Sequence, residues 1–285
     1  MLSFTKDILS KMEKFLTDIF TEKEANVITF GVDTGKLSKK TLQIYRKASR
    51  FIEPFDVEKK KNLLARVKVF DKGDVKIDKV KQKTKKIISS TKFPLMLSYS
   101  HLPSFYSTQA FDEKTKIIIF DAHADLKEKY MDRKISGYGS KNERLNDATW
   151  LKRLCEIKNP KKIAILGLRS CDENELRFIK EKGIFYYTAE QIKDNLFTAK
   201  NVLREFTRDS DVYVSLDMDV FDPSAAPGVD HPEPNGIFFE HFSELVRFIG
   251  GKIVGMDVCC LKPVRGNEQT EYLAIRSIFE ILGKL

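Results

Sequence analysis

The sequence has few of the residues that would place it among disulfide-rich, zinc-finger or membrane proteins. Its 285 residues include only four cysteines, four histidines and one tryptophan. The cysteines form no Cys-x-x-Cys pair, which argues against a disulfide framework and favours reduced thiols. No apolar run reaches the roughly 18 residues that a membrane helix needs, and the N-terminal residues lack the pattern of a signal peptide. We therefore expect a cytoplasmic protein with no membrane partner.

The formal net charge is +9, and a strongly basic chain often binds nucleic acid. Here, however, the lysines are scattered through amphipathic stretches and acidic residues are interspersed among them. Neither an aromatic RNA-binding motif nor zinc-finger spacing accompanies them. The charge pattern is typical of an ordinary solvated surface, and we expect no nucleic-acid partner.

Apolar segments and amphipathic segments alternate along the whole chain. The segments that we expect to form buried strands include residues 26–31, 93–97, 117–120, 162–167, 212–216 and 253–258. Strands separated by helical segments predict a parallel sheet covered on both faces. An amphipathic helix is expected over residues 4–19 and a long loop over residues 130–147. Because we find no internal repeat or linker, we expect one α/β domain over residues 1–285.

Two acidic segments directly follow apolar strands and define a candidate site. Residues 121–125 have the sequence Asp-Ala-His-Ala-Asp, and residues 217–219 have the sequence Asp-Met-Asp. Carboxylates at the end of a buried strand need a compensating charge, and oxygen ligands with one imidazole suit a divalent cation such as Mn²⁺. Alternation along a strand would turn these side chains to one side. The candidate ligands are therefore Asp121, His123, Asp125, Asp217 and Asp219.

His101 is a sixth candidate ligand. It follows the strand expected over residues 93–97, which would neighbour the other strands that carry ligands. A single histidine after a strand is more often structural. Here only four histidines exist in the chain, and two of them, His101 and His123, fall at strand ends. We therefore expect His101 to bind metal together with the other five residues.

Taken together, the two acidic segments resemble the signature motifs of the ureohydrolase family, which contains arginases and agmatinases. The loop over residues 226–236 (APGVDHPEPNG) is more similar to that of agmatinases than to that of arginases. The resemblance implies a three-layer α/β/α sandwich around a mainly parallel sheet. It also implies two Mn²⁺ ions per chain, one held by His101, Asp121, Asp125 and Asp217 and the other by His123, Asp121, Asp217 and Asp219. Asp121 and Asp217 would then bridge two ions about 3.5–4 Å apart.

The same resemblance implies hydrolysis of a guanidino compound to urea and an amine. The ions would supply a hydroxide near neutral pH, and Asp125 would accept a hydrogen bond from it and then help to protonate the leaving amine. The agmatinase-like loop favours agmatine, which would give putrescine and urea. Arginine, guanidinobutyrate and guanidinopropionate remain alternative substrates, and a metal-binding regulatory protein without activity remains an alternative function. The resemblance also implies a homo-oligomer, a trimer or a hexamer.

Three positions depart from the pattern of the family. Two glycines usually stand near the first histidine ligand, but residues 98–101 have the sequence Ser-Tyr-Ser-His. Asp147 stands where the family has a histidine that relays protons, and His231 is a candidate replacement. Cys260 stands where the family has a glutamate that pairs with the guanidinium, although a thiol cannot form this bidentate pair. Either Glu233 or Asp147 takes that role, or the substrate is not a usual guanidine.

Overall fold

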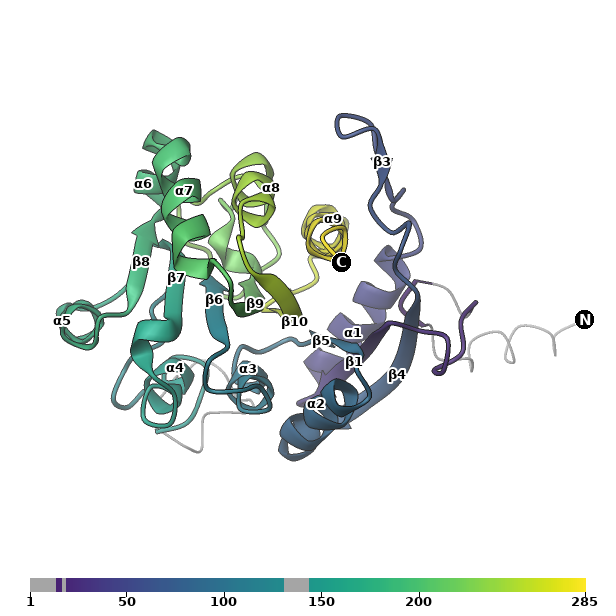
Figure 1. Cartoon of the computed structure of the whole chain (residues 1–285), viewed down its shortest axis with the longest axis horizontal. Helices are drawn as coiled ribbons and strands as arrows, with labels where there is room; N and C mark the ends of the chain where they lie inside the picture. Colours follow the sequence, from purple (N-terminus) through teal and green to yellow (C-terminus); the bar gives the residue numbers. More distant parts are fainter. Residues whose placement is uncertain (1–13, 17–18, 131–143) are drawn as a thin grey trace, which may run out of the picture.

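A sheet of eight strands forms the centre of the computed structural model, which describes residues 14–16, 19–130 and 144–285 (Figure 1). The helix expected over residues 4–19 and the loop expected over residues 130–147 lie largely outside these ranges. The strands are β1 (Val27–Asp33), β4 (Val69–Lys76), β5 (Phe93–Leu97), β6 (Lys116–Phe120), β7 (Ile163–Leu168), β8 (Phe185–Thr188), β9 (Asp211–Asp217) and β10 (Lys252–Cys259). Their spatial order is β4-β1-β5-β10-β9-β6-β7-β8, and all pairings in this sheet are parallel. A short antiparallel pair, β2 (Phe55–Asp56) and β3 (Lys61–Asn62), lies outside the sheet.

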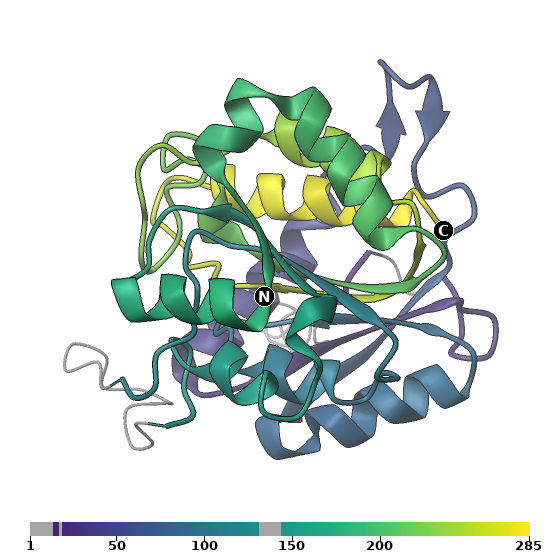
Figure 2. The same ribbon diagram turned by 60° about the vertical axis from the view of Figure 1, so that its left-hand side comes forward.

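Helices cover both faces of the sheet (Figures 1 and 2). One layer contains α1 (Lys36–Ala48), α6 (Ala189–Asp194), α7 (Leu196–Thr207), α8 (Phe239–Arg247) and α9 (Gln269–Leu282). The other contains α2 (Val80–Ser89), α3 (Pro103–Thr108), α4 (Trp150–Leu154) and α5 (Glu173–Lys182). The predicted three-layer α/β/α sandwich is therefore confirmed.

Each face of the sheet has its own apolar core, as the strand β6 illustrates. Ile118 and Phe120 are buried with the layer that contains α9, whereas Ile117 and Ile119 are buried with the layer that contains α4. This division follows from the alternation of side chains along a strand. A strand that is covered on both faces needs apolar residues at successive positions, which explains the continuous apolar run of β6.

The local sequence also explains where several helices begin and end. Asp172 caps α5, because its carboxylate accepts hydrogen bonds from the backbone of Asn174 and Glu175. Gly183 ends the same helix in the left-handed conformation, with φ of 70°. No helix in the described ranges is both long and apolar enough to span a membrane.

Candidate metal centre

The carboxyl ends of β5, β6 and β9 bring the first group of predicted ligands together. His101 follows β5, Asp121 follows β6, and Asp217 is the last residue of β9. The Nδ1 atom of His101 lies 3.1 Å from Asp121 Oδ2 and 3.2 Å from Asp217 Oδ2. The same nitrogen lies 3.3 Å from Asp125 Oδ2. One buried imidazole nitrogen is therefore surrounded by oxygens of three carboxylates.

A second group of predicted ligands adjoins the first through Asp121. His123 Nδ1 lies 3.0 Å from Asp219 Oδ2 and 3.6 Å from Asp121 Oδ1. The two oxygens of Asp121 thus face two different histidines, since Oδ2 faces His101. A carboxylate can serve two cations in this way because each of its oxygens has lone pairs to share. The six residues predicted from the sequence are all brought together.

The way these residues converge differs from the prediction, which relied on strand alternation. The strand β6 ends at Phe120 and β9 ends at Asp217, so turns carry the residues that follow. Asp125 has φ of 52°, and the backbone N–H of Asp219 donates to Asp217 Oδ1 over 2.9 Å. In an extended strand, alternate residues would lie about 7 Å apart. The turns bring their side chains closer than a strand can.

The geometry around His101 fits a metal ligand. Its Nδ1 atom is buried and makes no hydrogen bond to the described residues, although the carboxylates are close. Its Nε2 atom lies 3.0 Å from Ser215 Oγ, and that hydroxyl donates to Asp257 Oδ1 over 2.8 Å. A chain of this kind fixes the imidazole ring and points the other nitrogen at a cation. Ser215 and Asp257 were not predicted, although their positions two residues before Asp217 and Cys259 place them on the same face.

The charges at the centre also call for cations. Burial, together with the charge of Asp121, raises the pKa of Asp125 to about 7. Burial and neighbouring carboxylates raise the pKa of Asp217 and of Asp219 as well. Burial lowers the pKa of His123, but Asp121 and Asp219 outweigh this effect and raise it to about 12. Without metal, the groups therefore compensate their charges with protons, and divalent ions would replace these protons.

Trp150 orients Asp125 and was not predicted as a functional residue. Its indole Nε1 donates a 2.7 Å hydrogen bond to Asp125 Oδ2, and its ring centroid lies 4.7 Å from that of His101. The side chain is fully buried at the start of α4. It is the only tryptophan in the sequence, and this rarity could have drawn attention to it. Trp150 therefore holds one ligand in place and packs against another.

Arg169 connects the acidic turn after β9 to the loop that carries Glu233. Its guanidinium donates to the backbone carbonyls of Asp219 at 2.7 Å, Glu233 at 2.8 Å and Pro234 at 3.0 Å. Three further carbonyls, of Gly167, Val220 and Phe221, lie within 3.3 Å of its nitrogens. A planar guanidinium with five N–H donors suits such a set of acceptors.

We expect Arg169→Lys to lower the free energy of unfolding by about 2–4 kcal/mol, because an ammonium cannot replace all these charge-assisted hydrogen bonds. Urea denaturation of the metal-free protein measures this loss. Arg208→Lys is the control, since Arg208 is exposed and its guanidinium pairs with Glu205 one helical turn away, and it should change stability by less than about 0.5 kcal/mol. Equal effects of the two substitutions would contradict the role given to Arg169.

Three of the remaining predicted site residues, Glu233, His231 and Asp147, lie around the centre rather than within it. Glu233 Oε1 lies 3.5 Å from His123 Nε2. The ring of His231, an exposed residue, lies 6.3 Å from the ring of His123. Asp147 is exposed, and its Oδ1 accepts hydrogen bonds from Ser100 Oγ and from a backbone N–H in the loop that carries His101. The structure places Asp147 as an anchor of that loop, and its predicted part in catalysis stays a prediction.

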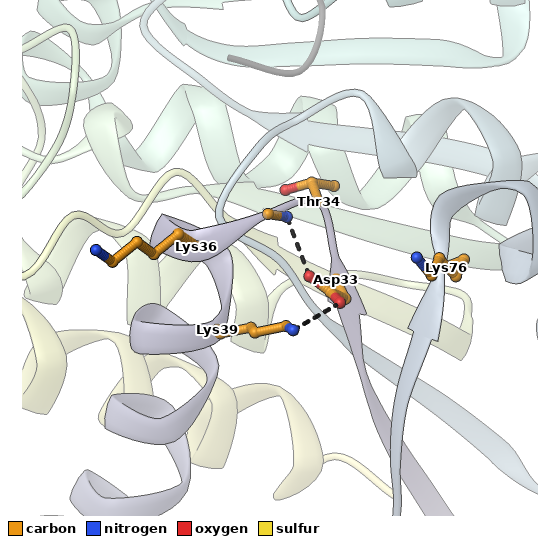
Figure 3. A pocket seen from close by; sticks show the side chains of 6 residues that line it. Asp33, Thr34, Lys36, Lys39 and Lys76 are labelled. Atoms are coloured by element: carbon orange, nitrogen blue, oxygen red, sulfur yellow. Dashed lines mark hydrogen bonds and ion pairs between the residues drawn. The ribbon is translucent and has the colours of Figure 1, made fainter. Parts of the chain in front are cut away.

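A hollow on another part of the surface lacks such a cluster (Figure 3). It has a volume of about 480 Å³ and is lined by residues at the end of β1, the start of α1 and Lys76. Its carboxylate, Asp33, already pairs with Lys39 at 3.6 Å and accepts a hydrogen bond from the backbone of Gly35. Within the described residues, the ligand groups gather at the centre formed by β5, β6 and β9.

Comparison with known proteins agrees with the fold. The model of the arginase family matches residues 42–283. The chain therefore belongs to the arginase family, and it is an enzyme of the ureohydrolase type, as the sequence motifs predicted.

The individual relatives include both main activities of the family. An agmatinase of Bacillus cereus is 30% identical over 235 residues, which cover 77% of this chain and 76% of the relative. An arginase of Bacillus subtilis is 30% identical over 224 residues, covering 73% and 74%. The crystal structure of the agmatine ureohydrolase of Thermoplasma volcanium superposes with a TM-score of 0.82 at 24% identity, covering 98% of this chain and 96% of that structure. Identity alone does not separate agmatine from arginine as the substrate.

Proposed function

We propose that this protein is a binuclear manganese ureohydrolase that releases urea from a guanidino compound, with agmatine as the substrate. The observation that carries the proposal is the buried Nδ1 of His101, which makes no hydrogen bond to the described residues and lies 3.1–3.3 Å from oxygens of three carboxylates. One ion would be held by His101, Asp121, Asp125 and Asp217, and the other by His123, Asp121, Asp217 and Asp219. When bound, two such ions supply a hydroxide near neutral pH.

The side chains of the chain would then move the proton and position the substrate. Asp125, fixed by the indole of Trp150, would accept the proton and return it to the leaving nitrogen, so that urea and an amine depart. His231, exposed beside His123, would exchange the proton with solvent, since an imidazole nitrogen can both accept and donate a proton. The carboxylate of Glu233 would pair with the guanidinium, a role that the thiol of Cys260 cannot fill.

Two features support agmatine over arginine as the substrate. Glu233 belongs to the agmatinase-like loop, and Arg169 binds the backbone of this loop next to the acidic turn. Arginine also carries an α-carboxylate, which would need a cation. Among the described residues near this loop, the cation Lys262 is already paired with Asp230 at 2.5 Å. An amine tail without a carboxylate therefore fits the charges of this loop better.

The test is urea release from a panel of guanidino compounds by the purified chain with added Mn²⁺. We expect agmatine to be hydrolysed faster than arginine, guanidinobutyrate or guanidinopropionate. A higher rate with another member of the panel would show that agmatine is not the preferred substrate, but the proposed hydrolysis of a guanidino compound would still hold. No urea from any compound would leave the metal-binding regulatory protein as the better interpretation.

We expect Glu233→Gln to raise the KM for the guanidino substrate about 10- to 100-fold, as expected when a charge-assisted hydrogen bond worth about 1.5–3 kcal/mol is lost. The manganese content should stay the same, because Glu233 contacts the outer nitrogen of His123 and not the carboxylates. Glu240→Gln, at an exposed position of α8, is the matched control. An unchanged KM in Glu233→Gln would assign guanidinium recognition to another residue.

We also propose, from the sequence and the family, that residues 1–285 form one domain that works in the cytoplasm as a trimer or hexamer. The absence of a membrane-spanning helix among the described residues is compatible with this location. Size-exclusion chromatography with light scattering measures the oligomeric state.

A further inference from the structure

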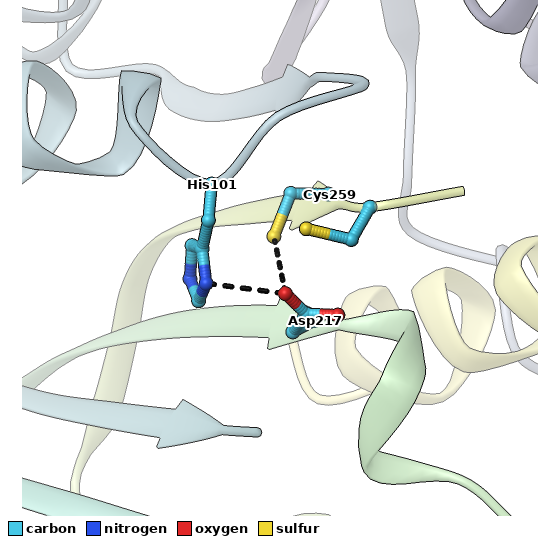
Figure 4. Close-up of side chains that lie close together, drawn as sticks. His101, Asp217 and Cys259 are labelled. Atoms are coloured by element: carbon cyan, nitrogen blue, oxygen red, sulfur yellow. Dashed lines mark hydrogen bonds and ion pairs between the residues drawn. The ribbon is translucent and has the colours of Figure 1, made fainter. Parts of the chain in front are cut away.

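Two adjacent cysteines lie beside His101 and Asp217 (Figure 4). Cys259 is the last residue of β10 and pairs in register with Asp217 on β9. It is fully buried, and its Sγ lies 3.8 Å from Asp217 Oδ2. One ligand atom from each of His101, Asp217, Cys259 and Cys260 lies within 4.8 Å of the others. The predicted metal position therefore has sulfur on one side as well as oxygen on the other.

The backbone of Cys260 is arranged so that both thiols reach this group. Successive residues of a strand point to opposite faces, so neighbouring cysteines in an extended chain would separate. Cys260 instead has φ of 62°, the left-handed conformation that a residue with a Cβ atom rarely adopts. This turn of the chain after β10 brings the thiol of Cys260 within 4.8 Å of the thiol of Cys259.

We propose that the ion bound by His101 and Asp217 also binds the thiolates of Cys259 and Cys260, so that this position prefers a thiophilic cation such as Zn²⁺. The proposal rests on the two-metal centre of the proposed function and replaces manganese by zinc at one of its two positions. The position formed by His123 and Asp219 keeps the nitrogen and oxygen ligands that suit Mn²⁺. In place of the carboxylates of Asp121 and Asp125, the other would use one imidazole, the carboxylate of Asp217 and two thiols, a set that suits tetrahedral zinc.

The distances between the ligand atoms agree with such a set. In a tetrahedral zinc site with bonds of about 2.0–2.3 Å, the ligand atoms lie about 3.3–3.8 Å from one another. Here His101 Nδ1 and Asp217 Oδ2 are 3.2 Å apart, and Cys259 Sγ and Asp217 Oδ2 are 3.8 Å apart. The unpartnered Nδ1 of His101 is the nitrogen that faces this group. Because all four atoms lie within 4.8 Å of one another, a shift on the order of 1 Å would close them around one ion.

Cobalt substitution of the whole chain tests the proposal, because Co²⁺ occupies zinc positions and reports thiolate ligands by an intense charge-transfer band in the near ultraviolet. We expect this band in the wild-type protein loaded with Co²⁺ under reducing conditions. Cys259→Ser and Cys260→Ser should each lose about half of its intensity, and the double variant all of it, since each thiolate contributes one ligand. The matched controls Cys155→Ser and Cys171→Ser, which lie outside the group, should keep the full band.

The outcomes separate this inference from the proposed function. Visible cobalt bands without the charge-transfer band in the wild type would overturn thiolate binding and leave a centre of nitrogen and oxygen ligands. Failure to bind either Co²⁺ or Mn²⁺ would overturn the centre and this inference together.

If the serine variants do not fold, alkylation of the wild-type protein tests whether the thiolates bind the ion. Bound Co²⁺ should slow alkylation of Cys260 by roughly tenfold or more, because a metal-bound thiolate is not free to react, while exposed Cys171 reacts at its usual rate. Equal rates at Cys260 with and without Co²⁺ would overturn thiolate binding.

Discussion

Asp217→Ala is expected to remove metal from both positions of the centre, whereas loss of a ligand to one ion alone would leave the other bound. The Oδ2 atom of Asp217 faces His101 Nδ1 at 3.2 Å. Its Oδ1 atom accepts the backbone N–H of Asp219 and so holds the turn that presents the second group of ligands. Mutation of a residue that only orients a metal ligand lowers metal affinity by up to about 100-fold. Because Asp217 would itself be a ligand, we expect its loss to lower the affinity for Mn²⁺ by more than about 100-fold.

Elemental analysis of the dialysed variant measures this effect, with urea release as a second measurement. Asp230→Asn is the matched control, because Asp230 is a nearby carboxylate that pairs with Tyr99 and Lys262 instead of facing the histidines. It should keep the metal content of the wild type. Retention of two ions per chain in Asp217→Ala would show that this residue does not bridge.

The residues that converge at the centre could be predicted from the sequence because their setting is unusual. Asp121 and Asp217 directly follow continuous apolar strands, where a carboxylate is costly without a compensating charge. His101 was harder to find, and its assignment depended on the expectation that its strand lies near the others. The alternation of βα units also predicted the three layers, since strands of this kind must be covered on both faces.

The residues around the ligands could not be predicted in the same way, because their roles depend on the order of the strands. The strand β10 lies between β5 and β9, although more than 150 residues separate it from β5 in the sequence. Only this order brings Asp257 and Cys259 to His101. Arg169 acts through backbone carbonyls of distant loops, and carbonyls leave no signature in the sequence. Convergence by turns was likewise missed, since aspartate tolerates the left-handed conformation better than most residues but adopts it at few positions, and the sequence does not mark Asp125 as one of them.

The second large effect concerns the dependence of metal binding on pH. In the metal-free centre, burial and neighbouring carboxylates raise the pKa of Asp217 and Asp219. Burial lowers the pKa of His101 and His123, but Cys259 together with carboxylates raises that of His101, and carboxylates raise that of His123, so that both end above the usual value. Each of these shifts makes the site hold protons that the free side chains would release. A cation binds only the deprotonated groups, so binding must displace protons, and affinity must rise with pH.

The size of this effect follows from the number of protons displaced. The pKa of His123 is raised to about 12, so its proton is present throughout the neutral range. If His101 and His123 each lose one proton, the affinity for Mn²⁺ should rise about 100-fold per pH unit between about pH 6 and about pH 8. Calorimetry in two buffers with different ionisation enthalpies counts the displaced protons directly.

The variant His123→Asn should lower the number of protons displaced on metal binding by about one. The control His241→Asn, at the start of α8 away from the centre, should leave this number unchanged. An affinity that does not change with pH would mean that the ligands are already deprotonated, and that the carboxylates do not hold the imidazoles as cations.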